Sequence, residues 1–144
     1  MTVIAWDGKT LAADKLICFG ATNGTVTKIQ RFGDCLVGLA GDFAIGTELL
    51  EWFKAGADPD NYPQSNRSFE SGASLILIKP DKTVWKYENA PYPFKLEGDF
   101  FAFGSGDESA LVAMEAGCDA KRAVEITCKY NTGCGNGVDT LKLL

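Results

Sequence analysis

Residues 2–14 read Thr-Val-Ile-Ala-Trp-Asp-Gly-Lys-Thr-Leu-Ala-Ala-Asp, two apolar runs on either side of an Asp-Gly pair. The first run, residues 2–6, contains the threonine, valine, isoleucine and tryptophan that favour buried strands. Asp7-Gly8 is a pair preferred in two-residue hairpin turns, and Thr10 to Asp14 then returns as the partner strand. This stretch therefore predicts that the chain begins with an antiparallel β-hairpin.

Further strands are expected where β-branched and apolar residues run between turn-forming residues. Thr25 to Ile29 alternates polar and apolar side chains, which predicts a strand with two distinct faces. Cys18 to Gly24 and Ala57 to Gly72 are expected to be loops because they are rich in glycine, asparagine, proline and other turn formers. The remaining expected strands are Cys35 to Ala40, Ala73 to Lys79, Thr83 to Tyr87, Asp99 to Phe103 and Val138 to Leu144.

Three helices are predicted from their start signals. Asp42 is placed to cap a helix whose apolar stripe has helical spacing. Ser105 followed by Glu108 fits a capping box and predicts a second helix. A third helix is expected from Ala120 to about Asn131. The stripe of the first helix consists of Ile45, Leu49, Trp52 and Phe53.

The order of these elements favours an α+β fold. The strands come in hairpins, so the sheets are expected to be largely antiparallel, and the helices are grouped in blocks rather than alternating with strands. At roughly 100–200 residues per domain, the chain of 144 residues is expected to form a single domain, residues 1–144.

The composition excludes several classes of function. The chain has no histidine, so it has no Ser-His-Asp triad, no Cys-His dyad and no histidine metal ligand. A net charge of -5 and the lack of a basic cluster argue against a nucleic-acid partner. No apolar run approaches the ~20 residues of a membrane span, and the N-terminus does not have the pattern of a secretory signal, so the cytoplasm is the expected compartment.

The cysteines are interpreted as small buried residues in a reducing compartment. None forms a C-x-x-C pair, and without histidine a zinc site is not expected. The sequence therefore predicts neither a metal nor another cofactor. The five cysteines are Cys18, Cys35, Cys118, Cys128 and Cys134.

Thr2 offers a chemistry that needs no histidine. If Met1 is removed, the Thr2 hydroxyl is the nucleophile and the α-amine of the same residue accepts the proton. The unperturbed pKa of an α-amine is about 7.7–8.0, so a modest depression leaves a useful neutral fraction at pH 7.

Six segments, in order, resemble the proteasome β-subunits and their bacterial relative HslV, and the resemblance extends over nearly the whole chain. It implies an N-terminal nucleophile (Ntn) hydrolase with a four-layer αββα sandwich of two largely antiparallel sheets. The segments are Thr2 to Gly8, Leu11 to Asp14, Val26 to Ile29, Gly38 to Asp42, Gly104 to Gly106 with the alanine-rich helix after it, and Ala123 to Glu125.

The resemblance also implies roles for five residues. Thr2 matches the nucleophile, and Asp14 matches the acid that follows the first hairpin. Lys28 matches the lysine whose charge lowers the local pKa and orients the hydroxyl. Gly41 matches the glycine whose N–H helps to form the oxyanion hole, and Ser105 matches the serine near the threonine amine. Each residue also has an ordinary structural interpretation. Thr2 is then a strand residue, Asp14 a strand end and Lys28 a solvent-facing lysine. Gly41 is then a turn glycine and Ser105 a helix cap.

The chain departs from the family pattern in two places. The family has an aspartate and a serine near the C-terminus that support the threonine, and the aligned positions here are Asn131 and Cys134. Between Gly41 and Ala73 there is room for one helix where the family has two, so a shortened helical layer is expected. In the family these helices help to assemble rings and meet partner proteins.

Three functions follow from these observations. The first is a threonine-type peptidase or amidohydrolase acting on a peptide or protein, expected as a homo-oligomer such as a ring and with an ATPase unfoldase as a candidate partner. The second is a catalytically silent protein of the same fold, used as an assembly or structural subunit, for example in a virus particle, because a retained Met1 leaves Thr2 acylated. The third is nucleotide binding by the glycine loop 133–137, but this loop follows a helix and precedes a strand, the reverse of the phosphate-binding order.

Overall fold

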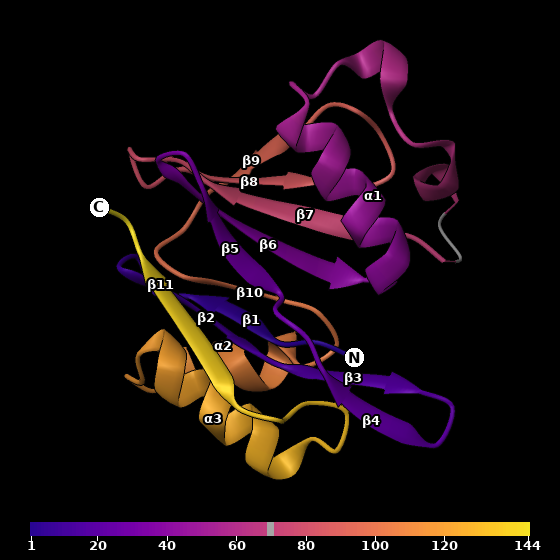
Figure 1. Ribbon diagram of the computed structural model, residues 1–144. Helices are drawn as coiled ribbons and strands as arrows, with labels where there is room; N and C mark the ends of the chain where they lie inside the picture. The colour runs from indigo at the N-terminus through magenta and orange to yellow at the C-terminus, as the bar shows by residue number, and fades with distance from the viewer. Residues whose placement is uncertain (69–70) are drawn as a thin grey trace.

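Two stacked antiparallel sheets, each covered by helix on its outer side, make up the computed structural model, which describes residues 1–68 and 71–144 (Figure 1). The strands are β1 Ile4–Trp6, β2 Thr10–Asp14, β3 Leu16–Phe19, β4 Thr22–Thr25, β5 Ile29–Phe32, β6 Cys35–Gly41, β7 Ala73–Ile78, β8 Val84–Tyr87, β9 Phe94–Leu96, β10 Phe101–Phe103 and β11 Val138–Lys142. The helices are α1 Phe43–Lys54, α2 Asp107–Glu115 and α3 Ala120–Tyr130, with 3-10 turns at Pro59–Asn61 and Gln64–Arg67.

The two sheets have the strand orders β10-β1-β2-β11 and β5-β6-β7-β8-β9. Helices α2 and α3 cover the outer face of the first sheet, and α1 covers the outer face of the second (Figure 1). The hairpin β3–β4 is a separate two-stranded sheet that projects from the body. This is the expected α+β fold with four αββα layers, and α1 with two 3-10 turns forms its shortened helical layer.

The alternation of side chains along β1 explains why the layers stack. Ile4 and Trp6 point into the core between the sheets, where they meet Ile76 of β7. Val3 and Ala5 point to the other side, against the alanine-rich faces of α2 and α3. Because neighbouring strand residues face opposite sides of a sheet, one apolar run fills two separate cores.

The N-terminal hairpin is confirmed, with Ile4 paired to Ala13 and Trp6 to Leu11. The Asp7 carboxylate accepts from the backbone N–H of Lys9 and Thr10 and so closes the turn.

The predicted helix caps at Asp42 and Asp119 are also confirmed, since each carboxylate accepts an N–H three residues ahead. The expected strands from Cys35, Ala73, Thr83 and Val138 form with boundaries shifted by a few residues.

Three predicted segments differ from the structure. Cys18 to Gly24 is not a loop but most of the hairpin β3–β4, which turns at Gly20, where φ is +62°. Thr25 to Ile29 is not one strand, because the chain leaves β4 at Thr25 and enters β5 only at Ile29. Ala57 to Gly72 is not simply exposed, since Tyr62 and Asn66 are buried; residues 69–70 lie outside the described residues. The short strand β9 was missed.

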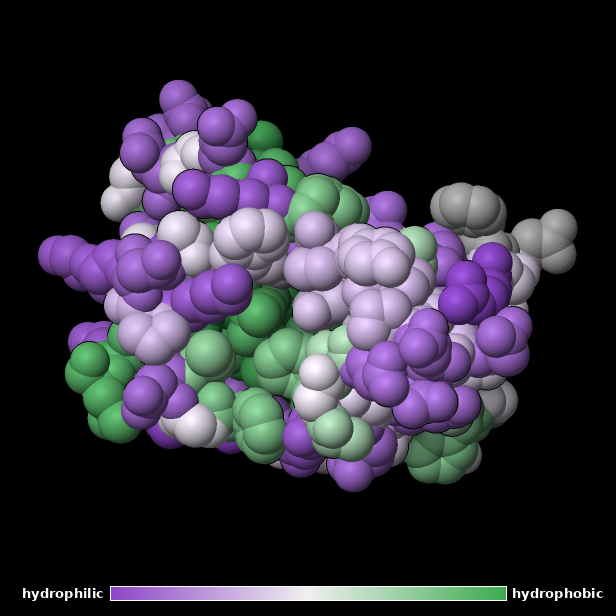
Figure 2. All heavy atoms as spheres, turned by 90° about the horizontal axis from the view of Figure 1, so that it is seen from above, coloured by the Kyte–Doolittle hydropathy of each residue, from purple (hydrophilic) through white to green (hydrophobic). Residues whose placement is uncertain are grey.

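Seen from above, hydrophilic residues cover much of the surface, with hydrophobic ones between them (Figure 2). Within the described residues, no helix is long and apolar enough to cross a membrane.

Candidate active site

Thr2 lies two residues before the start of β1 and is almost fully buried, with 6% of its surface exposed. Its N–H donates to Ser105 Oγ at 3.2 Å, and its carbonyl oxygen accepts from the N–H of Gly106 at 3.0 Å. Gly104 has a φ of +91°, and a Cβ there would overlap the Thr2 carbonyl, so the close approach of this turn requires glycine. The turn between β10 and α2 thus fixes the backbone of Thr2.

Asp14 ends β2 and has no exposed surface. Its carboxylate accepts four hydrogen bonds: from Lys28 Nζ at 2.9 Å and from the backbone N–H groups of Val3 at 3.0 Å, Gly135 at 3.1 Å and Leu16 at 3.3 Å. One cation and three amide dipoles therefore compensate its buried charge.

Lys28 lies in the segment between β4 and β5 and is 3% exposed. Its Nζ donates to Asp14 Oδ1 and to the carbonyl oxygen of Met1, each at 2.9 Å. The interpretation of Lys28 as a solvent-facing residue is therefore wrong. A buried ion pair is weak evidence for stability, so its place beside the candidate nucleophile makes Lys28 a candidate functional residue.

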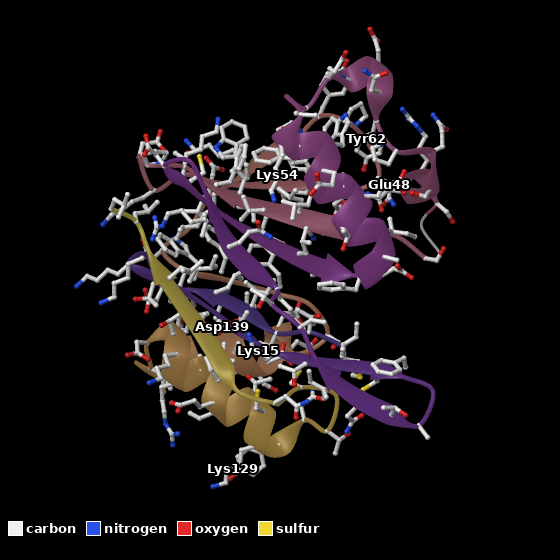
Figure 3. The ribbon with its side chains drawn as sticks, in the orientation of Figure 1. Lys15, Glu48, Lys54, Tyr62, Lys129 and Asp139 are labelled. Carbon is white, nitrogen blue, oxygen red and sulfur yellow. The ribbon has the colours of Figure 1, made fainter. Side chains whose placement is uncertain are left out.

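A second ion pair holds the strand ends around Asp14. Lys15 donates to Asp139 Oδ2 at 2.7 Å and to Thr27 Oγ1 at 3.2 Å. Asp139 lies on β11 and Lys15 follows β2, so the pair joins two strands that are far apart in the sequence (Figure 3). Lys15 directly follows Asp14 and Thr27 directly precedes Lys28, so the bonds of Lys15 connect the two segments that carry the buried ion pair.

The loop after α3 contributes a backbone hydrogen-bond donor to the site. Asn131 Oδ1 accepts from the N–H of Gly133 and the Asn131 carbonyl accepts from the N–H of Cys134, while the Asn131 N–H donates to the Thr127 carbonyl at the end of α3. Cys134 is buried, and burial raises the pKa of its thiol, with the negative charge of Asp14 adding to the rise. These two residues therefore shape the loop that delivers the Gly135 N–H to Asp14.

Two cavities flank Thr2, and Gly41 lines both. One, about 340 Å³, is lined by residues of β3 and the start of α1 together with Lys28 and Asp42; the other, about 370 Å³, lies between the two sheets. Gly41 has a φ of +100°, and a Cβ there would stand 2.5 Å from the carbonyl oxygen of Gly72. A substrate amide that reaches Thr2 would therefore have space on both sides of it and a glycine backbone beside it.

The structure brings Thr2, Asp14, Lys28, Gly41 and Ser105 to one place. The predicted capping box is wrong, because α2 is capped by the backbone at Gly106 and Ser105 Oγ accepts from Thr2 instead.

Three contributors were missed at the sequence level. Gly135 donates to Asp14 across 121 residues of sequence, which no local pattern signals. The carbonyl of Met1 as a partner of Lys28 was also not foreseen. Lys86 lines the cavity between the sheets, and the alternation along β8 could have shown which face it occupies.

The site is built from a hydroxyl, an ion pair and backbone groups. Within residues 1–68 and 71–144, no group of three or more histidine, cysteine, aspartate or glutamate side chains is placed to hold a metal ion. The chemistry that these residues offer is nucleophilic attack by Thr2 with electrostatic support from Lys28.

Comparison with solved structures assigns the fold. Eukaryotic HslV from Trypanosoma brucei is similar over 97% of this chain and 97% of its own, with a TM-score of 0.73 and 20% identity. BPH from Thiobacillus denitrificans is similar over 99% of this chain and 98% of its own, with a TM-score of 0.70 and 21% identity. The same BPH in complex with epoxomicin gives a TM-score of 0.69 at 20% identity.

Sequence comparison adds nothing further: no family model and no curated protein matches the chain. The structural similarity over the full length shows that the chain has an HslV-like, proteasome-like fold.

Proposed function

We propose that this chain, with its HslV-like fold, is an Ntn hydrolase: an N-terminal threonine peptidase or amidohydrolase that becomes active when Met1 is removed. Thr2 Oγ attacks the carbonyl carbon of an amide, and the α-amine of Thr2 takes the hydroxyl proton and passes it to the leaving amine. Water then hydrolyses the acyl-enzyme. The observation that carries the proposal is the buried Lys28, whose Nζ is held by Asp14 and reaches the residue directly before Thr2.

Removal of Met1 changes two groups at once. The Thr2 nitrogen, an amide N–H while Met1 is attached, becomes an amine that has a lone pair and can act as a base. Lys28 loses the Met1 carbonyl as an acceptor and keeps Asp14, which leaves a donor free for the Thr2 hydroxyl in the cavity that both residues line. Ser105 Oγ, 3.2 Å from the Thr2 nitrogen, orients the new amine.

Charge stabilisation comes from the surroundings of Thr2. The Lys28 ammonium lies in a site with little access to water, where its charge acts strongly on a developing alkoxide. The Gly41 N–H is the proposed donor to the oxyanion, and such a donor contributes about 3 kcal/mol to transition-state stabilisation in other hydrolases.

The first experiment is an intact mass and N-terminal sequence of the purified protein, followed by peptide hydrolysis and labelling with an epoxyketone. Thr2 is expected as residue one, with activity and labelling that Thr2→Ala abolishes while leaving the protein folded. Thr22→Ala, a threonine on the exposed strand β4, is the matched control and should behave as the wild type. BPH was solved in complex with an epoxyketone, epoxomicin, which supports the choice of probe.

Native, folded protein that retains Met1 and resists labelling would contradict the peptidase proposal. It would favour a catalytically silent subunit of the same fold, in which Met1 keeps the Thr2 nitrogen acylated. A Met1-free protein that hydrolyses no peptide would contradict the proposal equally.

We also propose the substrate, assembly, partner and location of this enzyme. The substrate is a peptide or protein, the assembly a homo-oligomer such as a ring, the partner an ATPase and the location the cytoplasm. Light scattering of the purified protein checks the oligomer, and a monomer as the sole species would contradict the ring.

A further inference from the structure

The cavity between the two sheets has walls of different character. Thr2, Gly104 and Ser105 form one side, and residues of the second sheet form the other. In the second sheet, Lys86 on β8 pairs directly with Ile76 on β7. Paired residues share a face of the sheet, and Ile76 belongs to the core between the sheets, so Lys86 also stands on the inner face.

Lys86 is the only charged side chain among the described residues that line this cavity. Ser74 lies two residues before Ile76 on the same face and adds a hydroxyl next to it. The cavity also borders Thr2, so a group bound there lies beside the proposed nucleophile. The space of about 370 Å³ therefore combines one cation with hydroxyl groups and has room for a side chain.

The present partner of Lys86 is replaceable. Lys86 Nζ lies 2.9 Å from Glu88 Oε1, but the two side chains are 24% and 46% exposed, and Glu88 does not line the cavity. Ion pairs this accessible to water contribute little to stability, so a ligand carboxylate can compete for the ammonium at small cost. The buried pair of Lys28 and Asp14, with exposed fractions of 2% and 0%, offers no such exchange.

The cavity on the other side of Thr2 differs. Besides Ile17 and Val26, its walls include the carboxylate-bearing Asp42, and its cation, Lys28, is already held by Asp14. The two cavities therefore differ in their charged groups: only the cavity between the sheets has a lysine whose carboxylate partner is exposed and replaceable.

We infer that the cavity between the sheets is a carboxylate-binding subsite, in which Lys86 receives an acidic group of the substrate. This inference rests on the proposed function of Thr2 and names the substrate class: peptides with a carboxylate close to the scissile amide, on the side of Thr2 that Lys86 faces. The carboxylate is either the side chain of an aspartate or glutamate or the free C-terminus of a short peptide.

The test compares matched peptides on Met1-free protein. One set carries Glu, Gln, Ala or Lys at each position next to the scissile bond, and a second set ends in either a free carboxylate or an amide. A charge-assisted hydrogen bond is expected to give about a tenfold higher kcat/KM for Glu than for Gln at one position, or for the free acid than for the amide. The set that shows the difference identifies the source of the carboxylate.

Three variants assign the effect to the residue. In Lys86→Met the Glu-to-Gln ratio should fall to about one, and in Lys86→Arg it should persist. Lys95→Met is the matched control, because Lys95 on β9 lines a different cavity, and its ratio should equal that of the wild type. Peptides cleaved without an acidic preference, or with a preference that survives Lys86→Met, would overturn the inference.

A binding measurement separates this inference from the proposed function. Thr2→Ala protein is titrated with the Glu and Gln peptides by calorimetry, with and without Lys86→Met. Tighter binding of the Glu peptide that depends on Lys86 supports the subsite even if nothing is cleaved, in which case only the peptidase proposal fails. Equal binding of the two peptides overturns the subsite whatever the activity.

Discussion

Replacing Lys28 by methionine removes the cation from the most deeply buried ion pair of the structure while roughly keeping the volume of the side chain. Asp14 has no exposed surface and Lys28 is 3% exposed, so the carboxylate left behind has no access to water. The Asp14 carboxylate keeps three of its four hydrogen bonds, from the N–H groups of Val3, Leu16 and Gly135. The substitution thus isolates the contribution of the charge partner.

The magnitude follows from this count of partners. Breaking a buried pair by removing one member costs about 3–5 kcal/mol, and the three remaining amide donors put Lys28→Met at the lower end, about 3 kcal/mol. For a chain of this length that corresponds to a fall of about 10 °C in Tm. Asp14→Asn should cost at least about 1 kcal/mol more, because it leaves Lys28 buried without a counter-charge and weakens the three backbone bonds as well.

The assay is equilibrium unfolding in urea, with the slope m checked to be unchanged so that the shift in midpoint reports stability alone. Lys54→Met is the control, since the Lys54–Glu51 pair is 3.9 Å long and partly exposed and should contribute less than about 0.5 kcal/mol; Figure 3 labels Lys54 on α1. A loss below about 1 kcal/mol for Lys28→Met, or a smaller loss for Asp14→Asn, would refute the reasoning that Lys28 compensates a buried carboxylate.

Three further predictions concern other parts of the molecule. Gly133→Ala should destabilise the protein by about 1 kcal/mol only while Met1 is present, because a Cβ at 133 would overlap the Met1 side chain; equal thermal shifts in the two forms would contradict this. Asn66→Ala should cost about 3 kcal/mol in urea unfolding, because the buried amide bonds β7 and the end of β8; a loss under 1 kcal/mol would contradict it. Burial, with nearby negative charge adding, raises the pKa of Cys128 to about 11, so about one thiol in 1,000 is ionised at pH 8, and iodoacetamide should modify exposed Cys18 long before Cys128, as peptide mass mapping would show. Because the pKa of the Cys128 thiol is raised, its ionisation leaves stability unchanged below about pH 9. Between pH 9 and 11 the unfolded chain releases this proton and the folded one does not, so stability falls there and does not recover at higher pH.

Local sequence was informative wherever neighbours in the chain decide the conformation. The Asp-Gly turn after Trp6 and the caps at Asp42 and Asp119 depend on contacts within three residues, and all three form as predicted. Thr25 to Ile29 misled for the opposite reason: its alternation fits a strand, but the chain there crosses from a projecting hairpin to the second sheet. The same crossing buries Lys28, a position that its polar type does not suggest.

Ser105 shows how tertiary contacts override a local motif. Its spacing to Glu108 fits a capping box, yet its hydroxyl accepts the N–H of Thr2 from the other end of the chain. A hydroxyl has few bonding directions, and the buried N–H of Thr2 would otherwise lack an acceptor, so the long-range bond prevails.

The sequence by itself determined the residue types and the local elements. The absence of histidine and a threonine at position 2 restricted the chemistry, and the hairpins and helix blocks defined an α+β fold. Only the tertiary structure decided which groups meet: Gly135 with Asp14, Lys28 with the carbonyl of Met1, and Lys86 with the cavity beside Thr2. The physical reason is that a buried charge must find its partners in space, and in a fold of two stacked sheets those partners come from segments that are far apart in the chain.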